Sequence, residues 1–135
     1  MIAYVDASTL VKIVRREKFS LDACEFLRGC DAVSSEVVAA EVLRSVSRQY
    51  AGTAQVMGDA IEAAMSVMAD VVLIMMQTAT IVRAGVIEGM SLRTLDAIHI
   101  ATAVGLGDVD VFVTYDERQA EAARLAGLRT VSPGV

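Results

Sequence analysis

The stretch LRTLDAIHIATAVGLGDVDVFVTYDERQ, residues 92–119, decides how the rest of the chain is interpreted. It contains a helix-periodic segment over 95–106, a glycine at 107 and an apolar strand candidate over 111–115. Two acids mark it: Asp96 opens the apolar helix, and Asp116 follows the strand directly. An aspartate is costly to keep near a core unless its charge is needed there. We therefore expect other segments to bring partners to both acids.

Outward from this stretch, strands and helices alternate along the whole chain. Strands are predicted over 2–5, 32–34, 71–75, 111–115 and 129–131, and helices over 8–16, 21–28, 35–50, 53–68, 78–88, 95–106 and 117–126. Glycines at 89, 107 and 127 fall where helices should end. Apolar strands separated by helices predict an α/β fold with a mostly parallel sheet covered on both faces. Residues 1–135 are expected to form a single domain.

Composition limits the possible classes of protein. Hydrophobic residues make up 55% of the chain and aromatic residues only 4%, so the core must be aliphatic, and a self-association surface is expected. The net charge of −5 argues against a general nucleic-acid binder, although the cations are mostly arginines, which suit phosphate recognition.

No secretory or membrane signal is expected. The longest relevant uncharged run lies between Asp70 and Arg83, short of the roughly 20 residues that a spanning helix needs. The opening MIAYVD has no basic region of a signal peptide. Cys24 and Cys30 offer neither metal-site spacing nor a disulfide framework, which together favours a reducing cytoplasm.

Four carboxylates are candidates for one shared site. Asp6 and Asp116 each follow a strand directly, Asp96 starts a helix, and Glu41 lies in the helix after the second strand. In parallel sheets, functional groups gather beyond the carboxyl ends of the strands, near a topological switch point. Clustered carboxylates repel unless a cation intervenes, and oxygen ligands select Mg²⁺ or Mn²⁺. Such a metal can activate water for phosphodiester hydrolysis without a catalytic histidine or cysteine.

Each acid also has a structural explanation. Asp6 and Asp116 could cap the helices that follow them, the latter with Gln119 three residues on. Asp96 could serve a helix dipole. Glu41 could form a salt bridge near Arg44. These alternatives stay open on local sequence alone.

Four segments in order, VDASTLVK, AAEVLRSVSRQ, LRTLDAIHIATA and VTYDERQAEAAR, resemble a PIN-domain ribonuclease, and most of all VapC-type toxins of toxin–antitoxin pairs. The resemblance covers residues 6–127. It implies a three-layer α/β/α domain and a Mg²⁺-dependent site whose acidic ligands are Asp6, Glu41, Asp96 and Asp116.

The resemblance also assigns polar neighbours of the acids. Thr114 matches a hydroxyl position two residues before the last acid and is expected to hold a carboxylate or a metal-bound water, or else to be an ordinary β-branched strand residue. Ser8 matches a small polar residue after the first acid, although a helix cap explains it equally. His99 has a family counterpart that is not a ligand, so we expect a structural histidine.

By resemblance, the expected activity is endoribonucleolytic cleavage that leaves a 5′-phosphate and a 3′-hydroxyl. The expected partners are a VapB-like antitoxin and a second copy of the chain. RNA would be guided by local basic residues, unless these only form a solvated surface: Lys12, Arg15, Arg16 and Lys18, with Arg44, Arg48 and Arg93 closer to the acids.

Two other classes of protein remain to be weighed. A receiver-like signalling domain would need a phosphoacceptor aspartate after its central strand, where VVLIMMQTAT has none, and a lysine where Ser132–Pro133 stand. A catalytically silent binding module with the same fold is the second alternative, although all four acidic positions are filled. A cleavage assay with and without chelator separates that module from an enzyme.

Overall fold

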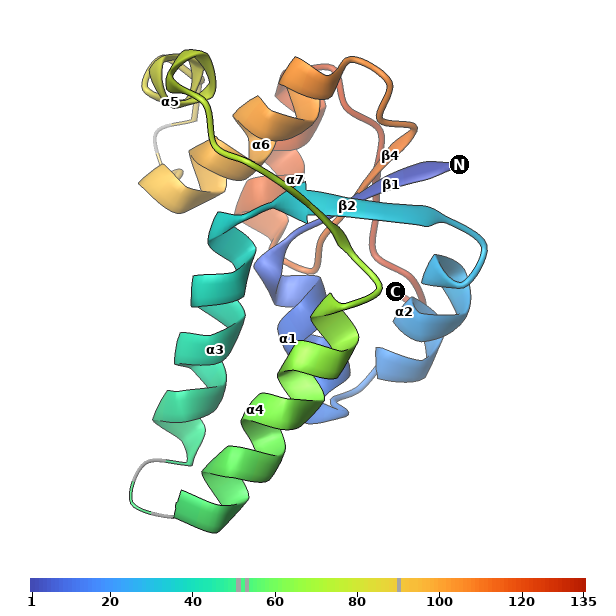
Figure 1. Cartoon of the computed structure of the whole chain (residues 1–135). Helices are drawn as coiled ribbons and strands as arrows, with labels where there is room; N and C mark the ends of the chain where they lie inside the picture. The colour runs from blue at the N-terminus through green and yellow to red at the C-terminus, as the bar shows by residue number, and fades with distance from the viewer. Residues whose placement is uncertain (51, 53, 90) are drawn as a thin grey trace.

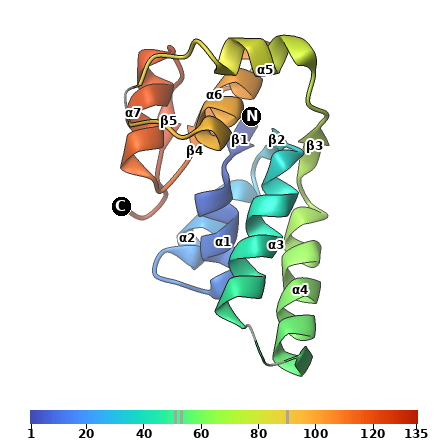
Figure 2. The same ribbon diagram turned by 90° about the vertical axis from the view of Figure 1, so that its left-hand side faces the viewer.

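A parallel sheet forms the middle of the molecule. The computed structural model describes residues 1–50, 52, 54–89 and 91–135, and within them five strands pair in the order β3-β2-β1-β4-β5 (Figures 1 and 2). All pairings are parallel. The strands are β1 (Ile2–Val5), β2 (Asp31–Ser35), β3 (Val72–Ile74), β4 (Val111–Val113) and β5 (Thr130–Val131).

Helices cover both faces of this sheet. Side chains alternate along β1, so Ala3 and Val5 point to one face and Tyr4 to the other. The first face packs against α1 (Ala7–Arg15), α2 (Ser20–Leu27), α3 (Val37–Gln49) and α4 (Ala54–Met68). The second packs against α6 (Thr94–Leu106) and α7 (Glu117–Leu125), with α5 (Thr78–Ala84) lying on α6 (Figure 2). The expected three-layer α/β/α fold with a parallel sheet is therefore confirmed.

The order of the strands reverses between β1 and β4. From β1 the chain moves outward through β2 to β3, whereas β4 lies on the other side of β1 and leads to β5. Val5 of β1 pairs with Val113 of β4, so the residues that follow these two strands leave the sheet side by side. This is the topological switch point at which α/β sheets place their functional groups.

One edge of the sheet is less covered than the sequence suggested. The apolar run over 71–75 predicts a strand in a sheet that helices cover on both faces. The comparison with a receiver domain takes this strand as the central one. In the structure it is the edge strand β3, and Val72 is 60% exposed and Met75 76% exposed. Exposed apolar residues continue onto α5 at Ile81 and Val82.

Most predicted boundaries agree with the structure to within two residues, and the clearest exception is α5. This helix ends at Ala84 instead of residue 88. Beyond it, the main-chain N–H groups of Val86 and Ile87 donate to the carbonyl groups of Arg83 and Ala84, three residues back, and not four as in an α-helix. Gly89 therefore caps no helix, whereas Gly107 ends α6 in the left-handed conformation. The predicted start of a helix at Thr53 lies outside the described residues. No helix in the described part of the chain is long and apolar enough to cross a bilayer.

Candidate acidic site

Asp6 lies at the centre of a dense set of hydrogen bonds. It follows β1, is 1% exposed and caps α1 by accepting from the main-chain N–H of Thr9 at 3.0 Å. The Thr9 hydroxyl donates to the same oxygen, and the Ser8 hydroxyl lies 2.7 and 2.8 Å from the two carboxylate oxygens. The capping role is thus confirmed, and Ser8 serves the carboxylate directly. Thr9 is a partner that the sequence did not single out.

Thr114 joins Asp6 to the second acidic segment. The Thr114 hydroxyl donates to Asp6 Oδ2 at 2.6 Å and accepts from the main-chain N–H of Asp116 at 3.1 Å. It therefore holds a carboxylate, as expected, although β4 ends at Val113 and Thr114 lies just beyond the strand. Burial raises the pKa of Asp6, and the hydrogen bonds from Thr114, Ser8 and Thr9 partly offset this by favouring the charged form.

Asp116 caps α7 and is linked to the start of α6 through Gln119. Asp116 Oδ1 accepts from the N–H groups of Arg118 and Gln119 at 2.9 and 3.3 Å. A reciprocal capping box does not form, because the buried Gln119 side chain instead lies 3.4 Å from the main-chain oxygen of Asp96. Gln119 therefore ties the start of α7 to the start of α6, a role that the sequence did not indicate.

Asp96 lies in the first turn of α6, facing other acids. Partial burial raises its pKa most, and the charges of Asp116 and Glu41 raise it further. The main-chain N–H of Arg93 and the nearby His99 act in the opposite direction. Like charges from α3 and from the start of α7 therefore act on one carboxyl group in α6.

Glu41 does not use the partner expected from local sequence. Instead of Arg44, its Oε1 contacts His99 Nε2 at 2.5 Å. His99 is 1% exposed, and its Nδ1 lies 2.8 Å from the Tyr4 hydroxyl. Both ring nitrogens of His99 therefore have hydrogen-bond partners, as expected, and one of these partners, Glu41, is one of the four candidate acids.

Hydrogen bonds through Thr114 and Gln119 link three of the acids. The fourth acid, Glu41, acts on one of them through its charge. Asp6 connects through Thr114 to Asp116, and Asp116 through Gln119 to Asp96. Glu41 enters through its effect on the pKa of Asp96. The four acids thus gather at the carboxyl edge of the sheet. As their side chains lie, however, no three His, Cys, Asp or Glu groups of the described residues are close enough together to enclose a cation.

The donor set is compatible with a hard cation. It consists of carboxylate oxygens supported by hydroxyls, which is the chemistry that Mg²⁺ and Mn²⁺ prefer. The mutual repulsion that raises the pKa of Asp96 is a further sign of uncompensated negative charge. Asp96, Asp116 and Glu41 are half-buried, so their carboxylates stay accessible to an ion from solvent.

The basic residues divide into two groups. In the first, Lys12 and Arg15 lie 3.7 and 3.6 Å from the carboxylate of Glu17, so part of their charge is compensated. Arg15 also donates to Ser45. In the second group, the exposed Arg44, Arg48 and Arg93 form no ion pair within the described residues.

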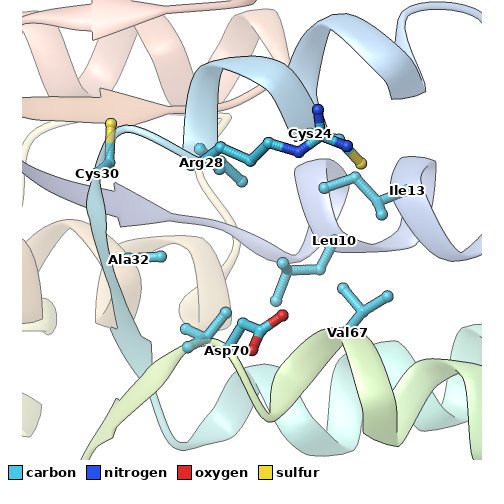
Figure 3. A pocket seen from close by; sticks show the side chains of 10 residues that line it. Leu10, Ile13, Cys24, Arg28, Cys30, Ala32, Val67 and Asp70 are labelled. Atoms are coloured by element: carbon cyan, nitrogen blue, oxygen red, sulfur yellow. The ribbon is translucent and has the colours of Figure 1, made fainter.

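A separate cavity of about 420 Å³ lies between α1, α2, α4 and β2 (Figure 3). Leu10, Ile13 and Val67 give it an apolar lining, and Arg28 and Asp70 provide its charges. None of the four candidate acids lines it. This cavity and the acidic edge are therefore two different places on the molecule.

Comparison with known proteins agrees with this geometry. The model of the PIN domain matches residues 3–125. Ribonuclease VapC46 of Mycobacterium tuberculosis is 34% identical over 132 residues, covering 96% of each chain. Ribonuclease VapC35 of the same species is 33% identical over 140 residues, covering 97% of this chain and 96% of its own. The crystal structure of VapBC2 from Rickettsia felis bound to a DNA fragment from their promoter matches with a TM-score of 0.73 at 14% identity, covering 97% and 98% of the two chains.

The sheet order, the helical layers and the acidic edge define an α/β/α domain of the PIN type. The chain belongs to the PIN-domain family, and its relatives place it among the VapC-type members. The resemblance carried by the four sequence segments is confirmed, and a receiver-like signalling domain is set aside.

Proposed function

We propose that this protein is a metal-dependent endoribonuclease and the toxin component of a VapBC-type pair. The observation that carries the proposal is the meeting of four acids from different elements at the carboxyl edge of the sheet, where Thr114 joins Asp6 to Asp116 by hydrogen bonds and Asp116 and Glu41 act on Asp96. Carboxylates gathered in this way repel one another unless a cation lies among them. The ribonuclease names of the relatives point to the same activity.

Asp6, Asp96 and Asp116 would hold one or two Mg²⁺ ions, with Mn²⁺ as a substitute, and Glu41 would complete the set directly or through water. When bound, the ion would supply Lewis-acid activation of water and of a phosphodiester oxygen, leaving a 5′-phosphate and a 3′-hydroxyl. Ser8 and Thr114 orient Asp6, and their hydrogen bonds partly offset the effect of burial on its pKa by favouring the charged form. Thr114 also fixes the main chain of Asp116.

RNA must approach an acidic protein through local positive charge. The exposed Arg44, Arg48 and Arg93 are better candidates for phosphate contacts than Lys12 and Arg15, which Glu17 partly neutralises. We therefore expect the affinity for RNA to fall only moderately as the salt concentration rises, because few phosphate contacts form. The affinity of a strongly basic protein would fall more steeply.

Two protein partners belong to the proposal, together with a cytoplasmic location. The matching structure of VapBC2 supports a VapB-like antitoxin as one partner. The second is another copy of this chain, because β3, α5 and the residues that flank them expose large apolar side chains that a homodimer could bury: Val72, Leu73, Met75, Ile81, Val82 and Val86.

The decisive experiment is an RNA cleavage assay with purified protein in Mg²⁺, in Mn²⁺ and after chelation. Wild-type protein should cleave only with metal, and Asp96→Asn should abolish cleavage while the protein remains folded. The matched control is Asp59→Asn, which removes a carboxylate from the exposed surface of α4 and should cleave at the wild-type rate. Full activity of Asp96→Asn, or cleavage that persists in chelator, would refute the proposal.

A catalytically silent PIN-fold module is the second candidate. The observation in its favour is that no three ligands of the described chain stand ready around one point. That module predicts no metal-dependent cleavage by the wild-type protein, so the same assay separates the two functions.

A further inference from the structure

The partner of Glu41 comes from the opposite face of the sheet. Glu41 lies on α3, which packs with α1 and α4, whereas His99 lies on α6, in the other helical layer. The first turns of α3 and α6 approach each other near the carboxyl end of β2 (Figures 1 and 2). The contact between His99 Nε2 and Glu41 Oε1 therefore joins the two layers at the edge where the acids gather.

Buried neighbours determine which nitrogen of His99 carries the proton. The Tyr4 hydroxyl accepts from the main-chain N–H of Ser35 at 2.9 Å and lies 2.8 Å from His99 Nδ1. A hydroxyl that already accepts one N–H is free to donate its own proton to Nδ1. Burial raises the pKa of Tyr4 well above its ordinary value, so this proton stays on the phenol. With Nδ1 accepting from Tyr4, the other ring nitrogen, Nε2, carries an N–H that faces Glu41.

We infer that His99 is a positioning residue for Glu41: its imidazole, oriented by Tyr4, donates Nε2–H to Oε1 and holds the carboxylate at the acidic edge of the sheet. The inference rests on the proposed nuclease function. Glu41 Oε2 receives no hydrogen bond from the described residues and stays available to a cation or its water. His99 acts through Glu41 and does not itself bind metal or substrate.

The geometry favours this role over one in stability alone. A histidine needed only for packing would be satisfied by Tyr4 and main-chain groups, whereas His99 uses its second nitrogen on an acid whose charge reaches Asp96. Without the imidazole, Glu41 would regain the rotamer freedom of a long side chain that is 19% exposed. Outer partners that orient acidic ligands typically change metal affinity or activity by about 10–100-fold.

The kinetic test compares two replacements of His99 with a stability control. His99→Leu should lower the cleavage rate and the affinity for Mn²⁺, measured by calorimetry, by about 10–100-fold. His99→Gln should recover most of both, because its amide N–H can donate to Glu41. Ile100→Val, at a fully buried position on the same helix, reports the effect of core destabilisation and should keep both values near wild type. Wild-type rate and Mn²⁺ affinity in His99→Leu would overturn the inference and leave the nuclease proposal intact.

A second measurement does not depend on cleavage. The chain has one histidine, so its ring nitrogens can be observed by ¹⁵N NMR without ambiguity. We expect an Nε2–H tautomer, and a shift toward a mixture of tautomers in Tyr4→Phe. A proton on Nδ1 alone in the wild-type protein would overturn the inference. A wild-type protein with the Nε2–H tautomer that cleaves no RNA would refute the nuclease proposal, and the Mn²⁺ affinities of the His99 variants would then decide the positioning role.

Discussion

Replacing Thr114 with valine removes one hydroxyl from the centre of the acidic site and changes the shape of the side chain very little. Thr114 is fully buried, and its hydroxyl donates to Asp6 Oδ2 at 2.6 Å while accepting from the N–H of Asp116 at 3.1 Å. The variant therefore leaves the buried Asp6 carboxylate with one donor fewer and the main-chain N–H of Asp116 without its acceptor.

The expected cost follows from these two bonds. A hydrogen bond to a charged group contributes about 1.5–3 kcal/mol and a neutral one about 1 kcal/mol, so the free energy of unfolding should fall by about 2–4 kcal/mol at neutral pH. The pKa of Asp6 should rise further, because the bond from Thr114 is the largest influence that lowers it. The loss should therefore shrink as the pH falls through the folded pKa of Asp6, which lies above its ordinary value of 3.8, since the protonated carboxyl needs the donor less.

Urea unfolding of the two proteins at several pH values measures this difference. The control is Thr130→Val, whose hydroxyl accepts from Arg124 at an exposed site and should cost about 0.5 kcal/mol or less. A loss below about 0.5 kcal/mol for Thr114→Val, or a loss that does not depend on pH, would show that the hydroxyl does not support the Asp6 carboxylate.

Three further outcomes follow from the same electrostatics. Asp96→Asn should raise the free energy of unfolding at neutral pH, because it removes a charge that burial and two neighbouring acids oppose; a lower urea midpoint would contradict this. In the wild-type protein, the raised pKa values of Asp6 and Asp96 favour the protonated folded state, so their contribution to stability should be complete below their unfolded pKa and lost as the pH rises through the folded pKa. Urea midpoints that rise as the pH increases above the ordinary aspartate pKa of 3.8 would count against this expectation. Added Mg²⁺ should raise the thermal midpoint of the wild-type protein more than that of Asp96→Asn, and EDTA should reverse the gain; equal shifts in the two proteins would place the ion elsewhere.

Most of the fold could be predicted from the sequence, because the patterns that indicate strands and helices are local. Apolar runs of strand length and helical periodicity located each element, and Asp6 and Asp116 marked the ends of two strands that prove to be neighbours. The end of α5 was not accessible, since Ile87 turns away from the helical path to pack against the core beneath α6, and only the folded chain shows that packing. The exposure of β3 was missed for the same reason, because an apolar run does not reveal whether a strand lies at an edge.

The candidate site was accessible only in part. The four acids could be named because strand ends and helix starts meet at one edge of a parallel sheet, whereas their catalytic and metal-binding roles stay predictions. The links between them could not be named. Gln119 follows a helix cap and suggests a capping box, yet its side chain reaches the start of another helix. Glu41 has an arginine one turn away, yet its partner His99 lies in the other layer.

The pairing of β1 with β4 has a consequence for synthesis of the protein. Asp6 is among the first residues to leave the ribosome, but Thr114 and Asp116 emerge only when most of the chain has been made. Until β4 settles against β1, a nascent polypeptide has no complete acidic edge. A cell that translates this nuclease would therefore be exposed to its activity only after elongation is nearly finished, which leaves time for an inhibitor to be present first.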